Sequence, residues 1–307
     1  MDLKSKIILI YGPTASGKSQ FALKLAKKIN GEIINADSMQ VYKELKILSA
    51  RPFLKDCKKI KHHLYGFQDS KKNFSTGIWL KLATQKILEK KKRKKTPILV
   101  GGTGLYFKAL TEGIVNIPNI PVRFREKIRS LHKKSGQKKF FLKLIKIDPL
   151  VRNHINPSDS QRSIRAYEIK LFTKKSMYDW FKKTKSNYDQ KSFYKIYLDF
   201  PRNDLIERIA QRARQMIKKG AINEVKKFIT LKIPRDKSVN KAIGVSEIEE
   251  YLNKKIEIEE VIEKISVKTR QYAKRQSTWA RGNMMNWKKI NPNSRNKLLK
   301  KKYKLIT

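Results

Sequence analysis

A segment near the start of the chain has the spacing of a phosphate-binding loop. Its residues, Gly12-Pro13-Thr14-Ala15-Ser16-Gly17-Lys18-Ser19, fit the pattern G-x-x-x-x-G-K-[ST]. Glycines let the backbone bend around phosphate oxygens, so that successive N–H groups and a helix N-terminus face the anion. Lys18 supplies a charge for the terminal phosphate, and Ser19 supplies a ligand for Mg²⁺. A glycine turn that binds nothing is the alternative, and it fits a complete pattern poorly.

A single carboxylate follows the next apolar run of the chain. The run Glu32 to Asp37 reads as a strand that ends on Asp37. In P-loop proteins driven by ATP, a later core strand usually ends in an acidic residue that holds the metal. Here the run Pro97 to Val100 is followed by Gly101-Gly102-Thr103-Gly104 instead. This weakens an ATPase interpretation and favours group transfer to a bound nucleophile, with Asp37 as the candidate base. A plain strand-end or helix-capping carboxylate remains the alternative for Asp37.

A parallel sheet is needed to bring these segments together. Short apolar runs predict strands over residues 7–11, 32–37, 97–100 and 194–200, and helical patterns follow them up to about residue 29 and over 77–95. Residues 202–287 are predicted to be mainly helical. Alternation of this kind is typical of an α/β protein. The sequence therefore predicts a P-loop NTPase-like parallel sheet core.

The middle of the chain no longer shows the alternation of strand and helix patterns. Residues 117–121 read Ile-Pro-Asn-Ile-Pro, which is a linker signal. Helical patterns follow, with one weak strand signal over 144–147. We predict a helical insertion domain over 116–193, a core formed by 1–115 and 194–290, and a basic, mobile tail over 291–307.

The chain is strongly basic. Lys and Arg number 73 against 26 Asp and Glu, which gives a formal net charge of +47. Such an excess favours a polyanionic partner with salt-sensitive affinity. The abundance of Lys, Ile and Asn is also typical of an AT-rich genome, so charge alone does not establish an RNA partner. The run of basic residues over 90–95 is more typical of a solvated helix end than of an RNA site.

Cysteine and hydropathy patterns exclude several classes of protein. Cys57 is the single cysteine, so an intrachain disulfide is impossible, and one cysteine with four histidines cannot assemble a structural zinc finger. No apolar stretch approaches the roughly 20 residues of a membrane span. A cytoplasmic protein that does not enter a membrane is expected.

Ordered motifs link the loop to the rest of the chain. After the P-loop come Asn35–Tyr42, His62-His63-Leu64, Val100–Phe107, Asp148-Pro149, Asn156–Arg162 with Arg165, Ala242-Ile243-Gly244, and Thr269–Gln276 with Thr278-Trp279. In this order they resemble the motifs of the bacterial tRNA dimethylallyltransferases. The resemblance spans roughly residues 7–287, and the joint order is far more specific than any single motif.

The resemblance implies a reaction and roles for particular residues. A dimethylallyl group would move from dimethylallyl diphosphate to the N6 amine of adenosine at tRNA position 37, with Mg²⁺ required. Asp37 matches the proposed general base of the family, and Lys18 and Arg212 match positions that act on the diphosphate, with Thr14 beside it. The protein is expected to act as a monomer.

The resemblance also implies a set of tRNA-binding residues. They are Asp37, Ser38, Met39, Gln40, Thr103, Arg125, Gln161, Arg162, Ser163, Ile164 and Arg165. Arg123 is an alternative to Arg125, because the alignment there crosses a variable linker. Arg270, Lys274 and Arg275 lie on a basic helix that either grips phosphates or is a solvated charged face.

Some positions depart from the family pattern, and two other functions stay open. The usual Gly-Thr-Ala-Lys-Pro appears as Leu48-Ser49-Ala50-Arg51-Pro52, which replaces a compact ammonium by a planar guanidinium. Val245 and Ala280 stand where aromatic residues are usual. A P-loop kinase that binds ATP and phosphorylates a nucleoside or an RNA end is the main alternative. A basic RNA-binding module with a vestigial P-loop is the third.

Overall fold

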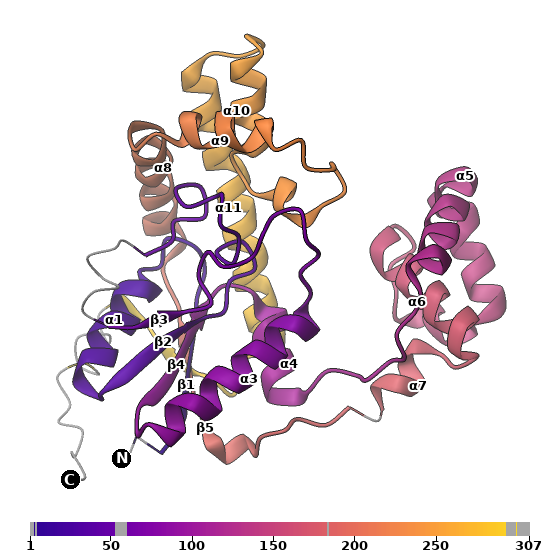
Figure 1. The fold of residues 1–307 in the computed structure, drawn as a ribbon, viewed down its shortest axis with the longest axis horizontal. Helices are drawn as coiled ribbons and strands as arrows, with labels where there is room; N and C mark the ends of the chain where they lie inside the picture. Colours follow the sequence, from indigo (N-terminus) through magenta and orange to yellow (C-terminus); the bar gives the residue numbers. More distant parts are fainter. Residues whose placement is uncertain (1–2, 4, 53–59, 183, 293–298, 300–307) are drawn as a thin grey trace. The chain divides into compact units, whose positions relative to one another are not determined.

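A computed structural model of the chain describes Leu3, residues 5–52, 60–182 and 184–292, and Leu299 (Figure 1). The chain divides into two compact units, one formed by residues 1–109 with 188–307 and the other by residues 110–187. Both limits of the predicted insertion, 116 and 193, lie six residues later than those of the second unit. Cys57 and most of the predicted basic tail lie outside the described residues.

The first unit is built on a six-stranded parallel sheet with the order β3-β2-β4-β1-β5-β6. The strands are β1 (Ile7–Tyr11), β2 (Gly31–Asn35), β3 (His62–His63), β4 (Thr96–Gly101), β5 (Phe193–Leu198) and β6 (Lys288–Ile290). The predicted α/β class and its four strands are confirmed. The edge strands β3 and β6 were not predicted, because two or three residues are too few to show a strand period.

Helices cover the sheet because its strands are apolar on both faces. Helix α1 (Lys18–Lys28) packs Phe21 and Leu25 against Ile8 and Ile10 of β1. The alternate residue Tyr11 meets Phe107 of α4 (Gly104–Glu112), with ring centroids 5.7 Å apart. Parallel strands place the loops after β1, β2 and β4 at one edge of the sheet, where α/β proteins bind ligands.

Helix α3 (Thr76–Lys92) ends in an ionic cluster that the sequence did not predict. Lys90 is 1% exposed, and its Nζ lies 3.0 Å from Glu32 and 2.9 Å from Glu89 of α3. His63 completes the cluster, with its Nε2 2.7 Å from the Glu32 carboxylate. The prediction of a solvated helix end is therefore wrong for Lys90, which is drawn inward by a buried carboxylate.

Among the described residues, the first unit has four more helices. They are α8 (Arg202–Lys218), α9 (Ala221–Thr230), α10 (Val245–Leu252) and α11 (Ile258–Asn283), with the short turns η2 (Gln190–Ser192) and η3 (Ser238–Lys241). Their apolar faces form a core with the loop after β2, which contributes Val41, Tyr42, Leu45 and Leu48. This second core places α8 and α11 beside the loops that follow β1 and β2.

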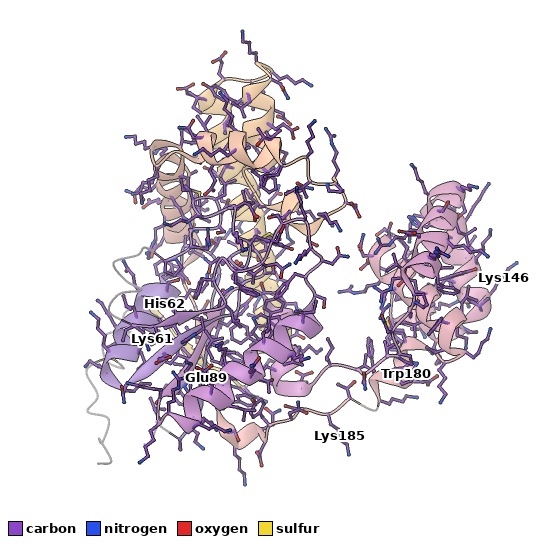
Figure 2. All side chains as sticks on the ribbon, in the orientation of Figure 1. Lys61, His62, Glu89, Lys146, Trp180 and Lys185 are labelled. Carbon is purple, nitrogen blue, oxygen red and sulfur yellow. The ribbon has the colours of Figure 1, made fainter. Side chains whose placement is uncertain are left out.

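The second unit is helical, as its sequence predicts. It holds α5 (Val122–Ile147), η1 (Pro149–Asn153), α6 (Ser160–Thr173) and α7 (Met177–Phe181), and α5 is broken at Gly136 (φ 70°). Phe140, Leu144 and Ile169 are in its core and Trp180 packs against it, whereas Lys146 is exposed (Figure 2). The weak strand signal over 144–147 was wrong, because these residues continue the apolar stripe of α5. Among the helices of the described residues, none is long and apolar enough to cross a membrane.

Candidate active site

The phosphate-binding loop joins β1 to α1, as its pattern requires. Gly17 adopts a left-handed conformation (φ 80°) directly before α1, which a side chain would disfavour. At Gly12, an added Cβ would lie 2.9 Å from Ser16 Oγ and 3.2 Å from Leu198. The loop is therefore wound closely against the end of β5, with its amides grouped at the start of a helix.

Lys18 lies half-buried at the first position of α1. Its Nζ donates to the Pro13 carbonyl oxygen at 3.4 Å. Burial lowers the pKa of Lys18 to about 8, while the Asp37 carboxylate raises it and the Arg212 guanidinium lowers it. Burial makes the charged form of Lys18 less favourable, and a nearby phosphate group would stabilise it, so Lys18 is well suited to bind phosphate.

Asp37 lies two residues beyond the end of β2. Its backbone N–H donates to Asn35 Oδ1, and its Oδ1 accepts a hydrogen bond from Met39 N–H, both at 2.9 Å. Asn35 Nδ2 also donates to the carbonyl oxygens of Asp37 and Leu64. The turn therefore holds the Asp37 carboxylate in one orientation through backbone and amide groups.

The glycine segment after β4 supports the Asp37 turn. A Cβ at Gly101 would lie 2.0 Å from the Ala36 carbonyl oxygen, so the two backbones approach too closely for any side chain. Thr103 Oγ1 accepts from Ser38 N–H at 2.9 Å and donates to Ser38 Oγ at 3.2 Å. The glycine segment after β4 thus positions residues 36–38. In an ATPase, this same segment would carry a metal-binding carboxylate.

Arg212 reaches the phosphate-binding loop from α8. Its guanidinium donates to Thr14 Oγ1 at 3.3 Å. Burial lowers the pKa of Arg212 and the Asp37 carboxylate raises it, yet a guanidinium remains charged. The structure therefore brings together Thr14, Lys18, Asp37 and Arg212, which the sequence singled out from distant segments.

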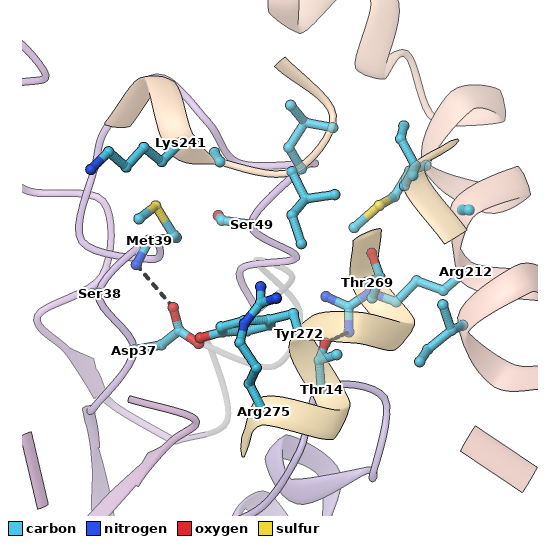
Figure 3. Close-up of a pocket in the computed structure, with 17 residues that line it drawn as sticks. Thr14, Asp37, Ser38, Met39, Ser49, Arg212, Lys241, Thr269, Tyr272 and Arg275 are labelled. Carbon is cyan, nitrogen blue, oxygen red and sulfur yellow. Dashed lines mark hydrogen bonds between the residues drawn. The ribbon is translucent and has the colours of Figure 1, made fainter. Parts of the chain in front are cut away.

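A pocket of about 270 Å³ is lined by Thr14, Asp37 and Arg212, while Lys18 is not among its lining residues (Figure 3). Thr14, Asp37, Ser38 and Arg212 are on its polar wall, and Ile209, Ala213, Met216, Ile243 and Ile265 are among its apolar lining. Such a mixture of an apolar wall and few placed polar groups is typical of a small-molecule site.

Helix α11 contributes polar pocket residues, of which the sequence had given a possible role, in gripping phosphates, to Arg275 alone. Thr269, Tyr272 and Arg275 line the pocket, together with Lys241 from η3. Burial, and then the charge of Asp37, raise the pKa of Tyr272, so that its hydroxyl stays protonated. Thr269, Tyr272 and Arg275 are each three residues apart, and this helical spacing was the local sign that they share one face of α11.

Predicted tRNA-binding residues of the first unit fall into two groups. Ser38 and Met39 line the pocket beside Asp37. Gln40 does not, because its Nε2 donates to the carbonyl oxygens of Ser49 and Ala50. That contact and the Glu224 carboxylate, which accepts from the backbone amides of residues 46–48, hold the loop that departs from the family pattern.

The remaining predicted tRNA-binding residues are in the second unit. Gln161 and Arg162 are exposed at the start of α6, and Arg162 pairs with Asp159 at 3.0 Å. Arg165 is 3.1 Å from Glu168, and Ile164 packs against the unit's core. Ser163 is fully buried, and its hydroxyl donates to the Asp159 carbonyl oxygen at 2.7 Å. Its side chain is therefore part of the core.

Arg123 and Arg125 differ in exposure. Arg123 is exposed near the start of α5, whereas Arg125 is half-buried and its Nε has no hydrogen-bond partner.

A magnesium ion fits the donor set at Ser19. Among the described residues, no group of three or more His, Cys, Asp or Glu side chains is arranged to hold a metal. Ser19 is exposed in the first turn of α1, next to the loop amides. Mg²⁺ keeps several waters and binds through one or two protein oxygens plus substrate phosphates, so a single hydroxyl is enough.

Comparison with known proteins places the chain among tRNA-modifying enzymes. The profile of the family described as IPP transferase matches residues 40–283. The tRNA dimethylallyltransferase of Pelagibacter ubique (strain HTCC1062) is 60% identical over 95% of this chain and 93% of its own length. That of Rickettsia massiliae (strain Mtu5) is 44% identical over 90% of this chain and 76% of its own.

Solved structures agree with these relatives. A tRNA isopentenylpyrophosphate transferase from Bacillus halodurans is 34% identical, with a TM-score of 0.68 over 96% of this chain and 94% of its own. A eukaryotic dimethylallyltransferase, captured acting on tRNA, is 28% identical, with a TM-score of 0.81 over 93% of this chain and 73% of its own.

Proposed function

Because the chain belongs to the IPP transferase family, we propose that it transfers a dimethylallyl group from dimethylallyl diphosphate to the N6 amine of adenosine 37 in tRNA. The enzyme class, a transferase that acts on tRNA, follows from the relatives. The donor, the acceptor atom and the position in tRNA are the proposal. The observation that carries it is one pocket that is lined by both the Arg212 guanidinium and the Asp37 carboxylate, with apolar side chains beside them.

The cationic side suits the diphosphate of the donor. Lys18 and Arg212 both lie at the phosphate-binding loop, and their charges stabilise the negative charge that grows as diphosphate leaves. When bound at Ser19 and the phosphate oxygens, Mg²⁺ would neutralise part of the same charge. The apolar wall formed by residues such as Ile209 and Met216 suits the dimethylallyl group.

The Asp37 side suits the acceptor amine. The amine nitrogen attacks the first carbon of the dimethylallyl group, and the bond from that carbon to the diphosphate oxygen breaks as its electron pair leaves with diphosphate. An N6 amine is a weak nucleophile that becomes acidic as the new bond forms, so a carboxylate within reach accepts its proton. Met39 N–H fixes one oxygen of Asp37. The product is N6-(dimethylallyl)adenosine.

The RNA must present one base to a pocket of about 270 Å³. An adenosine reaches such a site only by leaving its stack, which costs a few kcal/mol and is easiest in a single-stranded loop. An anticodon loop meets that requirement. The exposed Gln161 and Arg162 of the second unit, and Arg270, Lys274 and Arg275 of α11, are proposed to hold its phosphates. The monomeric state and cytoplasmic location remain predictions.

Substrate choice tests the proposal directly. The protein is incubated with an unmodified anticodon stem-loop, Mg²⁺ and either dimethylallyl diphosphate or labelled ATP. One dimethylallyl group on adenosine is expected with the first donor, and no phosphate transfer with the second. Omission of Mg²⁺ should slow the reaction. Phosphorylated RNA without prenylated adenosine would instead identify a P-loop kinase.

A further inference from the structure

Gln276 joins the phosphate-binding loop to the glycine segment after β4, which supports the Asp37 turn. Its Oε1 accepts a hydrogen bond from Thr14 N–H, and its Nε2 donates to the Gly102 carbonyl oxygen, both at 2.8 Å. Its backbone carbonyl oxygen accepts from the Tyr11 hydroxyl at 2.9 Å. The side chain is 4% exposed. Since Thr14 offers a donor and Gly102 an acceptor, only one orientation of the carboxamide satisfies both.

Each end of this link continues to one side of the pocket. The Thr14 hydroxyl accepts from Arg212 at 3.3 Å. Beyond Gly102, the next residue, Thr103, accepts from Ser38 N–H at 2.9 Å, and Ser38 follows Asp37. An unbroken series of contacts therefore runs from Arg212 through Gln276 to the Asp37 turn.

The glycine segment after β4 is shaped to receive this helix. A Cβ at Gly102 would lie 2.1 Å from Gln276 Nε2, and its nearest contact outside Gln276 would be an ordinary 3.5 Å, to the Gly12 carbonyl oxygen. At Gly104 an added Cβ would lie 2.4 Å from the ring of Trp279, which is three residues after Gln276 on the same face of α11. Both glycines leave space for α11 side chains.

We propose that Gln276 is a positioning residue that fixes the diphosphate side of the pocket relative to Asp37. The inference rests on the proposed function and goes beyond it. The residues that line the pocket do not include Gln276, so it acts through Thr14 and Gly102. Thr14 N–H is committed to the carboxamide, and the Thr14 hydroxyl is left to meet Arg212. A displacement of about 1 Å between reacting groups lowers rates on the order of 10²-fold.

Steady-state kinetics of Gln276→Ala test the role. Loss of the link should lower kcat/KM for dimethylallyl diphosphate on the order of 10²-fold, mainly through kcat. The Kd for stem-loop RNA should change by less than about twofold. The matched control is Gln271→Ala, an exposed glutamine of the same helix, which should keep wild-type kinetics. All variants are assayed well below their unfolding temperatures.

A double substitution separates positioning from stability. In Gly102→Ala, the added methyl group would displace Gln276 Nε2 from the Gly102 carbonyl oxygen. This variant should therefore show the same loss of kcat/KM as Gln276→Ala. Combined with Gln276→Ala, it should add no further loss, because the clashing side chain is gone. Losses that multiply, or a lowered unfolding temperature with unchanged kcat, would overturn the inference.

If Gln276→Ala does not fold, Gln276→Glu is used to test the positioning role instead. A protonated glutamic acid can make both contacts, whereas its carboxylate can only accept. The activity of this variant relative to wild type should therefore rise as the pH falls, and a pH-independent ratio would contradict the role. If wild-type protein makes no prenylated adenosine, the proposed function fails. If wild type is active and Gln276→Ala equals it, only this inference fails.

Discussion

At the scale of single residues, Asp37 has a structural contact and a proposed chemical role that can be separated. In Asp37→Asn, the amide oxygen still accepts from Met39 N–H, but the group no longer takes up a proton. We expect kcat to fall by about 10² to 10⁴-fold, with little change in RNA affinity. Single-turnover rates and RNA binding are compared with Asp69→Asn, which keeps a similar contact to Lys71 N–H outside the pocket. Equal losses of rate and affinity would make Asp37 structural.

Arg212 should affect the donor rather than the RNA. Its guanidinium is the donor that joins α8 to Thr14, so Arg212→Met should lower kcat/KM for dimethylallyl diphosphate on the order of 10²-fold. Arg214→Met removes an exposed arginine from the same helix and should leave donor kinetics unchanged. If both variants lose RNA affinity equally and donor kinetics are normal, Arg212 belongs to the RNA surface.

Motif spacing was sufficient to predict some of these residues and not others. Lys18 and Asp37 follow strands, so a parallel sheet brings them together by its topology. Gln276 and Tyr272 reach the same place from a helix more than 200 residues away, and no local pattern specifies where that helix docks. Ser163 shows a limit of motif matching, because a motif match does not reveal that a hydroxyl is buried.

At the scale of elements, close approach of β2 and β4 makes Gly101 indispensable. Gly101→Ala places a methyl group 2.0 Å from the Ala36 carbonyl oxygen, and we expect it to reduce the free energy of unfolding by about 3 kcal/mol or more. Gly282→Ala, near the end of α11, meets nothing within 4 Å and should stabilise by up to about 1 kcal/mol. Urea denaturation measures both, and equal midpoints would refute the close approach.

The buried cluster at the end of α3 should make stability depend on pH. Burial acts to raise the pKa of Glu32, but hydrogen bonds from His63 and Lys90 outweigh it and hold the pKa below 4.5. Its stabilising contribution is therefore complete above pH 4.5 and is lost as the pH falls through the lowered value. Glu32→Gln should be much less stable than wild type at pH 7 and approach it in acid. A difference that stays constant as the pH falls from 7 to well below the lowered pKa of Glu32 would contradict this.

Elements with a repeated pattern were predictable, and short or inward-turning ones were not. The apolar runs of β1 and β4 are continuous, which identifies buried parallel strands. The edge strand β6 has three residues. Lys90, on helix α3, turns inward because it pairs with the Glu32 carboxylate of strand β2. Both depend on tertiary contacts that local sequence does not encode.

At the scale of the whole molecule, the net charge of +47 should govern RNA affinity. Binding of stem-loop RNA releases counterions, so affinity should fall on the order of tenfold or more between about 50 and 200 mM salt. The KM for dimethylallyl diphosphate should change less, because its contacts are enclosed in the pocket. Titrations at several salt concentrations measure the slope. An RNA affinity that is independent of salt would show that the excess charge is only compositional.

The proposed reaction is defined above all by its acceptor atom, the N6 amine of adenosine 37. Two stem-loops are compared that differ only at position 37, one with adenosine and the other with inosine, which lacks the exocyclic amine. Nucleoside mass spectrometry after incubation with dimethylallyl diphosphate and Mg²⁺ should find a dimethylallyl group on the adenosine RNA alone, while both RNAs bind with similar affinity. A dimethylallyl group on the inosine RNA, or at another nucleoside of the adenosine RNA, would contradict the account.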